Sequence, residues 1–116
     1  MTGRGAERIA AILLVLKGYR LLARRLASRA GTGAGEVDLI ARRGRTLVFV
    51  EVKSRASLAA AAESIRPEQR RRIARAAEAF LAAHPALAGL AIRFDAVLVA
   101  PGRIPRHVPD AWRGDS

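Results

Sequence analysis

GEVDLIARRGRTLVFVEVK, residues 35–53, contains two apolar segments on either side of a glycine-containing turn. Residues 46–53 are rich in β-branched and aromatic side chains, which favour a strand over a helix. Gly44-Arg45 predicts a two-residue hairpin loop, with glycine in the first position that a type II′ turn favours. The fold is therefore expected to contain an antiparallel hairpin over this segment.

The length of the hairpin loop decides which side chains meet across the two strands. With a two-residue loop, Arg43 pairs with Thr46. Asp38 then lies directly opposite Glu51, and alternation along the strand adds Lys53 to the same face. A three-residue loop would turn Asp38 to the other face. We predict the two-residue loop, because only that register brings the three charged groups together.

Two carboxylates that face each other across a strand pair repel, so Asp38 and Glu51 need a compensating cation. Mg²⁺ fits this requirement, because it prefers carboxylate oxygens and takes only one or two of them from a protein. The alternative is that Glu51 and Lys53 form an exposed ion pair on an edge strand, with Asp38 solvated near a turn. The apolar residues on both sides of Glu51 favour the metal site.

Asp38 followed after a hairpin by Glu51-Val52-Lys53 resembles the core motif of the PD-(D/E)xK nuclease superfamily. Residues 35–41, 48–55 and 93–95 resemble, in that order, three phrases of the bacterial YraN family, which is described as predicted endonucleases distantly similar to archaeal Holliday-junction resolvases. The resemblance covers about residues 3–110. It implies an α/β, restriction-endonuclease-like core, a mixed β-sheet flanked by helices, which agrees with the expected order of helix, three strands, helix and strand.

The resemblance also implies an activity, that of a metal-dependent DNA endonuclease acting on branched or recombination and repair DNA. Asp38 and Glu51 would hold Mg²⁺ or Mn²⁺, and the Val52 carbonyl would complete the shell. Lys53 would orient the attacking water or stabilise the developing charge. The alternative is a non-catalytic nucleic-acid-binding module that keeps the nuclease fold. Resolvase-like nucleases often act as dimers, so a homodimer is a further expectation, although no apolar stripe identifies an interface.

Composition restricts the class of protein. A net charge of +11, from 21 basic and 10 acidic residues, predicts attraction to polyanions, with nucleic acid ahead of an anionic membrane surface. Codon bias explains the preference for arginine, since Lys17 and Lys53 are the only lysines, but not the excess of bases over acids. The absence of cysteine excludes disulfides and favours the cytoplasm. The 116 residues are expected to form one domain.

The N-terminal part predicts a helix after a frayed segment, residues 1–5. An apolar stripe at i, i+3, i+4 and i+7 indicates its buried face, formed by Ile9, Ile12, Leu13 and Leu16. This apolar run is too short to cross a bilayer, and Gly18 is placed to end the helix. Glu7, in the first turn, either favours the helix dipole or, by the family resemblance, supplies a third metal ligand.

Residues 19–26 read as a first strand, and residues 28–35, with three glycines, read as a loop. Residues 92–99 are apolar on both faces and predict a central strand. Asp95 at its start either supports the site or pairs with Arg93, and we favour the pairing. The tail, residues 101–116, contains three prolines and is expected to be irregular, with Trp112 packing back on the domain.

A second helix is expected to begin at Pro67 and to end before Pro85. Its buried stripe is formed by Ile73, Ala76, Ala77 and Phe80. Its first two turns carry four arginines, which are candidates for contacts to nucleic-acid phosphates or form a solvated face: Arg70, Arg71, Arg72 and Arg75. The alanine-rich residues 57–65 before it read either as a helix or as a flexible arm.

Overall fold

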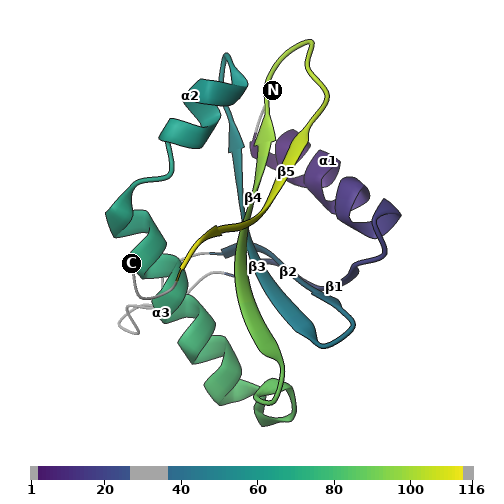
Figure 1. Ribbon diagram of the computed structural model, residues 1–116, viewed down its shortest axis with the longest axis vertical. Helices are drawn as coiled ribbons and strands as arrows, with labels where there is room; N and C mark the ends of the chain where they lie inside the picture. Colours follow the sequence, from purple (N-terminus) through teal and green to yellow (C-terminus); the bar gives the residue numbers. More distant parts are fainter. Residues whose placement is uncertain (1–2, 27–36, 114–116) are drawn as a thin grey trace.

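The computed structural model describes residues 3–26 and 37–113, so the predicted loop over residues 28–35 lies outside the described residues. Within these described residues, four helical segments and five strands follow one another (Figure 1). In chain order they are α1 (Gly3–Leu16), β1 (Arg20–Leu26), β2 (Val37–Arg43), β3 (Thr46–Ser54), α2 (Leu58–Glu63), α3 (Pro67–Ala83), the 3₁₀ turn η1 (Pro85–Leu87), β4 (Ala91–Val99) and β5 (Arg106–Trp112).

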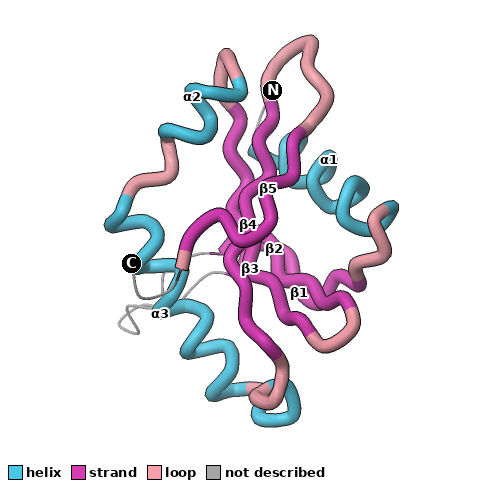
Figure 2. Tube along the Cα trace, in the orientation of Figure 1, coloured by secondary structure: helices cyan, strands magenta, loops and turns pink. Residues whose placement is uncertain are grey.

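The strands form one sheet in the order β1-β2-β3-β4-β5. β3 and β4 are parallel, and the other neighbours are antiparallel. α1 covers one face of the sheet, and α2 and α3 cover the other, as Figures 1 and 2 show. This arrangement confirms the predicted α/β fold with a mixed sheet flanked by helices.

The β2–β3 hairpin has the predicted register. Arg43 pairs with Thr46, and the pairing continues to Leu39 opposite Val50. Gly44 takes a φ of 61°, a left-handed conformation that costs glycine little. The two-residue loop is therefore confirmed, and with it the side-chain alternation on which the candidate site depends.

Alternation along β3 builds a separate core on each face of the sheet. Leu47 and Phe49 face α2 and α3, and the ring of Phe49 meets that of Phe80 edge-on at 5.9 Å between centroids. Val48 and Val50 face α1 and pack with its Leu14. Because both faces are covered, a charged side chain near the end of β3 is enclosed by apolar neighbours.

α1 differs from the prediction in two respects. It begins at Gly3, so residues 3–5 are helical, where the sequence predicted a frayed segment. Its buried residues are mostly alanines, while Ile12 and Leu16 are 54% and 80% exposed. The predicted stripe is therefore wrong in Ile12 and Leu16, whereas Ile9 and Leu13 are partly buried against the core. Small side chains on the buried face let the helix lie close to the sheet. Gly18, with a φ of 90°, ends the helix as predicted.

α2 and α3 settle the segment that the sequence left open. Residues 58–63 form a short helix, and Ser57 caps it by accepting the Ala60 N–H at 3.0 Å. α3 begins at Pro67, as predicted, and its buried residues are the predicted Ile73, Ala76, Ala77 and Phe80. No helix among the described residues is long and apolar enough to cross a membrane.

The C-terminal segment corrects the prediction of an irregular tail over residues 101–116. Arg106–Trp112 forms β5 and pairs with β4. Proline is tolerated there because β5 is an edge strand, and the pairing shifts register between Phe94 and Ala96 to accommodate the kink. Trp112 is buried and stacks on Phe94 at 5.7 Å between ring centroids, so it packs back on the domain as predicted.

Candidate active site

Three charged side chains that the sequence singled out come from one hairpin. Asp38 lies near the start of β2, and Glu51 and Lys53 lie in the last part of β3. Alternation places Glu51 and Lys53 on the face that Leu47 and Phe49 share with α2 and α3. Glu51 is only 5% exposed, while Asp38 and Lys53 are half-buried. The site therefore opens to solvent through Asp38 and Lys53.

The backbone of β3 positions the Asp38 carboxylate. Its Oδ2 accepts a hydrogen bond from the Val52 N–H at 2.8 Å. The regular pairing of the two strands reaches Leu39 opposite Val50, and the same register extended by one residue sets Asp38 opposite Glu51. The Asp38 carboxylate thus takes the place of a backbone carbonyl as the acceptor for the Val52 N–H. This bond fixes the orientation of the Asp38 side chain beside Glu51.

The two carboxyl groups interact strongly. Burial raises the pKa of Glu51 to about 9, and the hydrogen bond and negative charge of Asp38 add to this effect. The positive charge of Lys53 and the Val52 N–H act in the opposite direction but do not compensate. Without a cation, therefore, Glu51 is protonated at neutral pH and is hydrogen-bonded to Asp38.

This donor set fits a hard divalent cation. Mg²⁺ takes one or two carboxylates from a protein and keeps water on its remaining positions. A cation between Asp38 and Glu51 would replace the proton on Glu51 and compensate the negative charge of Asp38, which adds to the effect of burial on the pKa of Glu51. Two carboxylates in this arrangement therefore fit a divalent cation that keeps its remaining positions open.

Glu7 is not brought into this pair. It is buried, at 4% exposure, on the helix that covers the opposite face of the sheet. Across residues 3–26 and 37–113, no three side chains of the types His, Cys, Asp and Glu form a group that could hold a metal ion. The structure therefore joins two of the three predicted ligands.

Asp95 is the centre of a different polar cluster, on the α1 face. It is fully buried and accepts two hydrogen bonds from Arg93, at 2.8 and 2.7 Å, so the predicted pairing is confirmed. Arg93 also donates to the Tyr19 hydroxyl at 2.6 Å, and His107 Nε2 lies 2.7 Å from the Asp95 carboxylate. Burial alone would raise the pKa of Asp95, but the bonds from His107, Arg93 and the Asp110 N–H lower it.

The sequence did not single out Tyr19 and His107 as members of this cluster. Tyr19 is 74 positions from Arg93, and His107 is 12 positions from Asp95 in a segment predicted to be irregular. The local signal was a single histidine in the tail. The cluster ties β4 to β5 and to the end of α1, and it assigns Asp95 a structural role.

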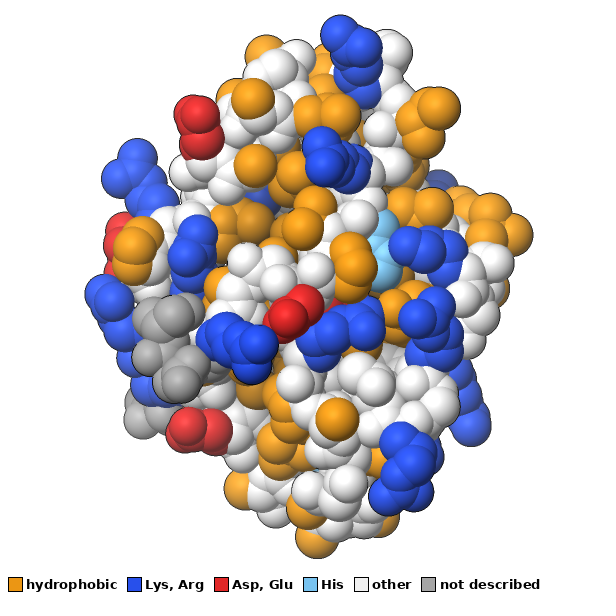
Figure 3. All heavy atoms as spheres, viewed as in Figure 1, with side chains coloured by type: hydrophobic (Ala, Val, Ile, Leu, Met, Phe, Trp, Pro, Cys, Tyr) orange, Lys and Arg blue, Asp and Glu red, His pale blue; other side chains and the backbone are white. Residues whose placement is uncertain are grey.

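Four arginines of α3 lie on the same side of the sheet as Glu51 and differ in exposure. Arg71, Arg72 and Arg75 are exposed, whereas Arg70 is half-buried and its Nε is buried without a hydrogen-bond partner. Lys and Arg side chains are spread over the face seen in Figure 3, which has few acidic side chains. Of the four, therefore, Arg71, Arg72 and Arg75 present their side chains to solvent.

The fold resembles that of a solved nuclease. The 1.6 Å structure of Hjc from Archaeoglobus fulgidus, a Holliday junction resolvase from an archaeal hyperthermophile, aligns with a TM-score of 0.60. The alignment covers 92% of this chain and 76% of that one, at 19% sequence identity. At this identity the likeness shows a shared fold, the restriction-endonuclease-like arrangement that the sequence predicted.

Sequence relatives extend along nearly the whole chain. A UPF0102 protein of Paramagnetospirillum magneticum is 63% identical over 113 residues, which cover 97% of this chain and 88% of that protein. A UPF0102 protein of Methylorubrum extorquens is 57% identical over 112 residues, covering 95% and 84% of the two chains. The model of the uncharacterised protein family UPF0102 matches residues 6–99. This chain therefore belongs to the UPF0102 family, the YraN family that its hairpin resembles.

Proposed function

We propose that this protein is a metal-dependent DNA endonuclease that hydrolyses phosphodiester bonds. The observation that carries the proposal is the convergence of Asp38, Glu51 and Lys53 at one end of the β2–β3 hairpin, with the Asp38 carboxylate bonded to the Val52 N–H. The resemblance of the fold to a Holliday junction resolvase supports this reaction class. It also makes branched DNA a substrate to test beside linear DNA.

Asp38 and Glu51 are the residues that would hold Mg²⁺ or Mn²⁺. The family resemblance adds Glu7 as a third candidate ligand. The bound ion would polarise the scissile phosphate and lower the pKa of the attacking water. Glu51 must lose its proton to act as a ligand, so its carboxylate would become negatively charged only when a cation binds. The Val52 N–H keeps the Asp38 carboxylate in place throughout.

Lys53 is the cation that the chain itself supplies. Its ammonium acts on Glu51 electrostatically, lowering the pKa that burial and Asp38 raise. A mobile ammonium group at this position would donate hydrogen bonds to the attacking water or to a non-bridging phosphate oxygen. Either bond strengthens as negative charge develops in the transition state, which is the condition for accelerating the reaction.

The nucleic-acid partner would be held mainly through its phosphates. The net charge of +11 supplies a general attraction, and the exposed Arg71, Arg72 and Arg75 lie on the side of the sheet that carries Glu51. Contacts of this kind position a duplex without reading its sequence. We therefore expect affinity that depends on salt more than on base sequence.

Cleavage of linear and four-way DNA, with Mg²⁺ and with Mn²⁺, tests the proposal. Asp38→Asn and Glu51→Gln should nearly abolish cleavage and leave DNA binding intact, because each removes a charged ligand at constant size. Lys53→Met should slow cleavage by about 100-fold or more. Glu63→Gln, which removes an exposed carboxylate from α2, is the matched control.

If the wild-type protein binds these DNAs but cleaves none of them faster than Lys53→Met, the endonuclease proposal is wrong. The chain would then be a nucleic-acid-binding module that keeps the nuclease fold.

A further inference from the structure

A pocket of about 410 Å³ lies where β3 and β4 end. Ser54 pairs with Val99 there, as the last pair of the parallel ladder, and the Arg55 N–H donates to the Val99 carbonyl at 3.1 Å. Beyond this point β3 continues towards α2 and β4 continues towards β5, so the two chain segments diverge. The crevice outside the carboxyl ends of parallel strands is a recurrent place for ligands in α/β proteins.

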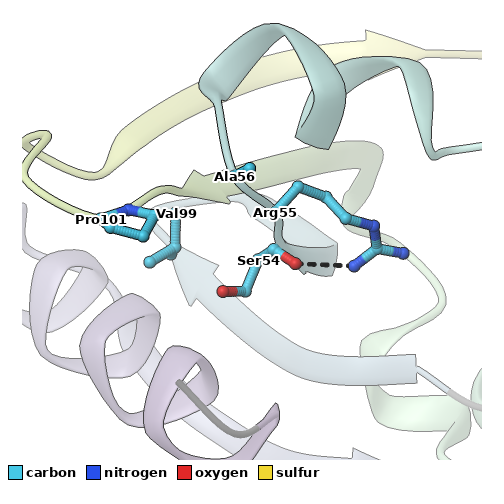
Figure 4. A pocket seen from close by; sticks show the side chains of 5 residues that line it. All are labelled: Ser54, Arg55, Ala56, Val99 and Pro101. Carbon is cyan, nitrogen blue, oxygen red and sulfur yellow. Dashed lines mark hydrogen bonds between the residues drawn. The ribbon is translucent and has the colours of Figure 1, made fainter.

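The lining combines one positive charge with an apolar wall. Five residues form it: Ser54, Arg55, Ala56, Val99 and Pro101 (Figure 4). None of them is acidic. Figure 4 shows the Arg55 side chain on one side, Val99 and Pro101 on the other, and Ser54 between them. A ligand that matches this lining carries an anionic group at one end and an apolar, flat or carbon-rich group at the other.

Arg55 is held in position but keeps most of its donors. Its Nη1 donates to the Ser54 carbonyl at 2.7 Å, the dashed bond in Figure 4. A guanidinium has five N–H donors, so this bond uses one of them. The planar group is therefore anchored at the rim of the pocket and presents further N–H groups, a geometry that suits bidentate contact with a phosphate.

The position of the pocket relates it to the candidate active site. Ser54 directly follows Lys53 in β3, so the pocket begins where the Asp38, Glu51 and Lys53 group ends. Its volume falls within the range of roughly 300–1,000 Å³ that small-molecule pockets occupy. That space suits one nucleotide and is too small for a base pair with its two backbones.

We propose that this pocket binds a single unpaired nucleotide, with the phosphate on Arg55 and the sugar and base against Val99 and Pro101. Ser54 offers its hydroxyl to the sugar or base. The proposal rests on the proposed function only in taking the nucleotide from a DNA strand at the candidate active site. The same chemistry belongs to a free nucleoside monophosphate, so the test includes both sources.

The first measurement is calorimetric titration of the metal-free 116-residue chain with a deoxynucleoside 5′-monophosphate, with the deoxynucleoside and with inorganic phosphate. The monophosphate should bind more tightly than either part alone. Arg55→Gln should weaken its binding about tenfold or more, because a charge-assisted hydrogen bond is lost. Ala56→Phe should abolish binding by filling the space. Both positions are exposed, so neither change removes core packing.

Two controls make the outcome specific. Arg66→Gln removes an exposed arginine next to α3 and should leave monophosphate binding unchanged. Glu63→Gln should also leave it unchanged, because Glu63 does not line the pocket. A short single-stranded oligonucleotide should compete with the monophosphate if a DNA strand is the source, and fail to compete if only free nucleotides enter.

Equal binding by wild-type, Arg55→Gln and Ala56→Phe proteins would overturn the proposal, as would inorganic phosphate binding as tightly as the monophosphate. The two proposals fail separately. A protein that binds the monophosphate through Arg55 but never cleaves DNA would retain the pocket and lose the endonuclease function.

Discussion

Glu51→Gln should stabilise the metal-free protein at neutral pH. The pKa of Glu51 is raised by burial and by Asp38 from 4.5 to about 9. Stability from such a group is fully present below the unfolded pKa and is lost as pH rises through the folded pKa. Because glutamine mimics the protonated acid, the wild type should lose stability relative to the variant across this range.

The magnitude follows from the distance between neutral pH and the ordinary pKa. At pH 7 the group lies about 2.5 pH units above that pKa, and each unit is worth about 1.4 kcal/mol, so the variant should be more stable by about 3 kcal/mol. In a chain of this length that difference corresponds to roughly 10 °C in melting temperature. Near pH 4.5 the two proteins should be equally stable.

Urea unfolding followed by circular dichroism, between about pH 5 and pH 8, measures this difference. In the presence of Mg²⁺ or Mn²⁺ the wild type should gain stability and the variant should not, because binding to the folded state shifts unfolding only where a ligand site exists. Glu63→Gln should show neither effect. A Glu51→Gln variant that is less stable than wild type at pH 7, or a difference that does not change with pH, would refute the reasoning.

Three further changes have expected outcomes. Replacing Arg71 and Arg72 together by alanine should lower the slope of log affinity for duplex DNA against log salt concentration by about 2, while Arg45→Ala at the hairpin turn should leave it unchanged. Asp95→Asn should lower the free energy of unfolding at pH 7 by about 3 kcal/mol, since it removes the carboxylate that neutralises Arg93. Because the pKa of Asp95 is lowered, this loss should shrink as pH falls through the folded pKa. Ser57→Ala should cost about 1 kcal/mol in thermal unfolding, through loss of the α2 cap.

Local features of this chain were predictable, and contacts between distant segments were not. Turn chemistry at Gly44 fixes the hairpin register, and alternation then places Asp38, Glu51 and Lys53 without further information. The start of α3 and its buried face are likewise set by signals that span only a few residues, namely Pro67 and the spacing of the apolar side chains. A site that lies within one hairpin is therefore accessible from sequence patterns.

Other features depend on packing partners. The large apolar residues of α1 indicated its buried face only in part, because the alanines that lie against the sheet give no strong signal in hydropathy. β5 was obscured by Pro109 and by the two prolines that precede the strand, and only pairing with β4 makes it a strand. The raised pKa of Glu51 comes chiefly from burial. The apolar residues next to Glu51 in the sequence indicate that it is buried, but the extent of burial depends on the packing of the whole domain.

β3 and β4 lie side by side as parallel strands, although partners such as Thr46 and Ala91 are far apart along the chain. Pairing β3 with β4 early in folding would close the long chain segment between them. The chain would lose conformational entropy before the stabilising contacts between the two strands had formed. The β2–β3 hairpin closes through two residues. We therefore expect folding to start with the segment that carries Asp38 and Glu51, and the crevice between the ends of β3 and β4 to take shape among the last parts of the molecule.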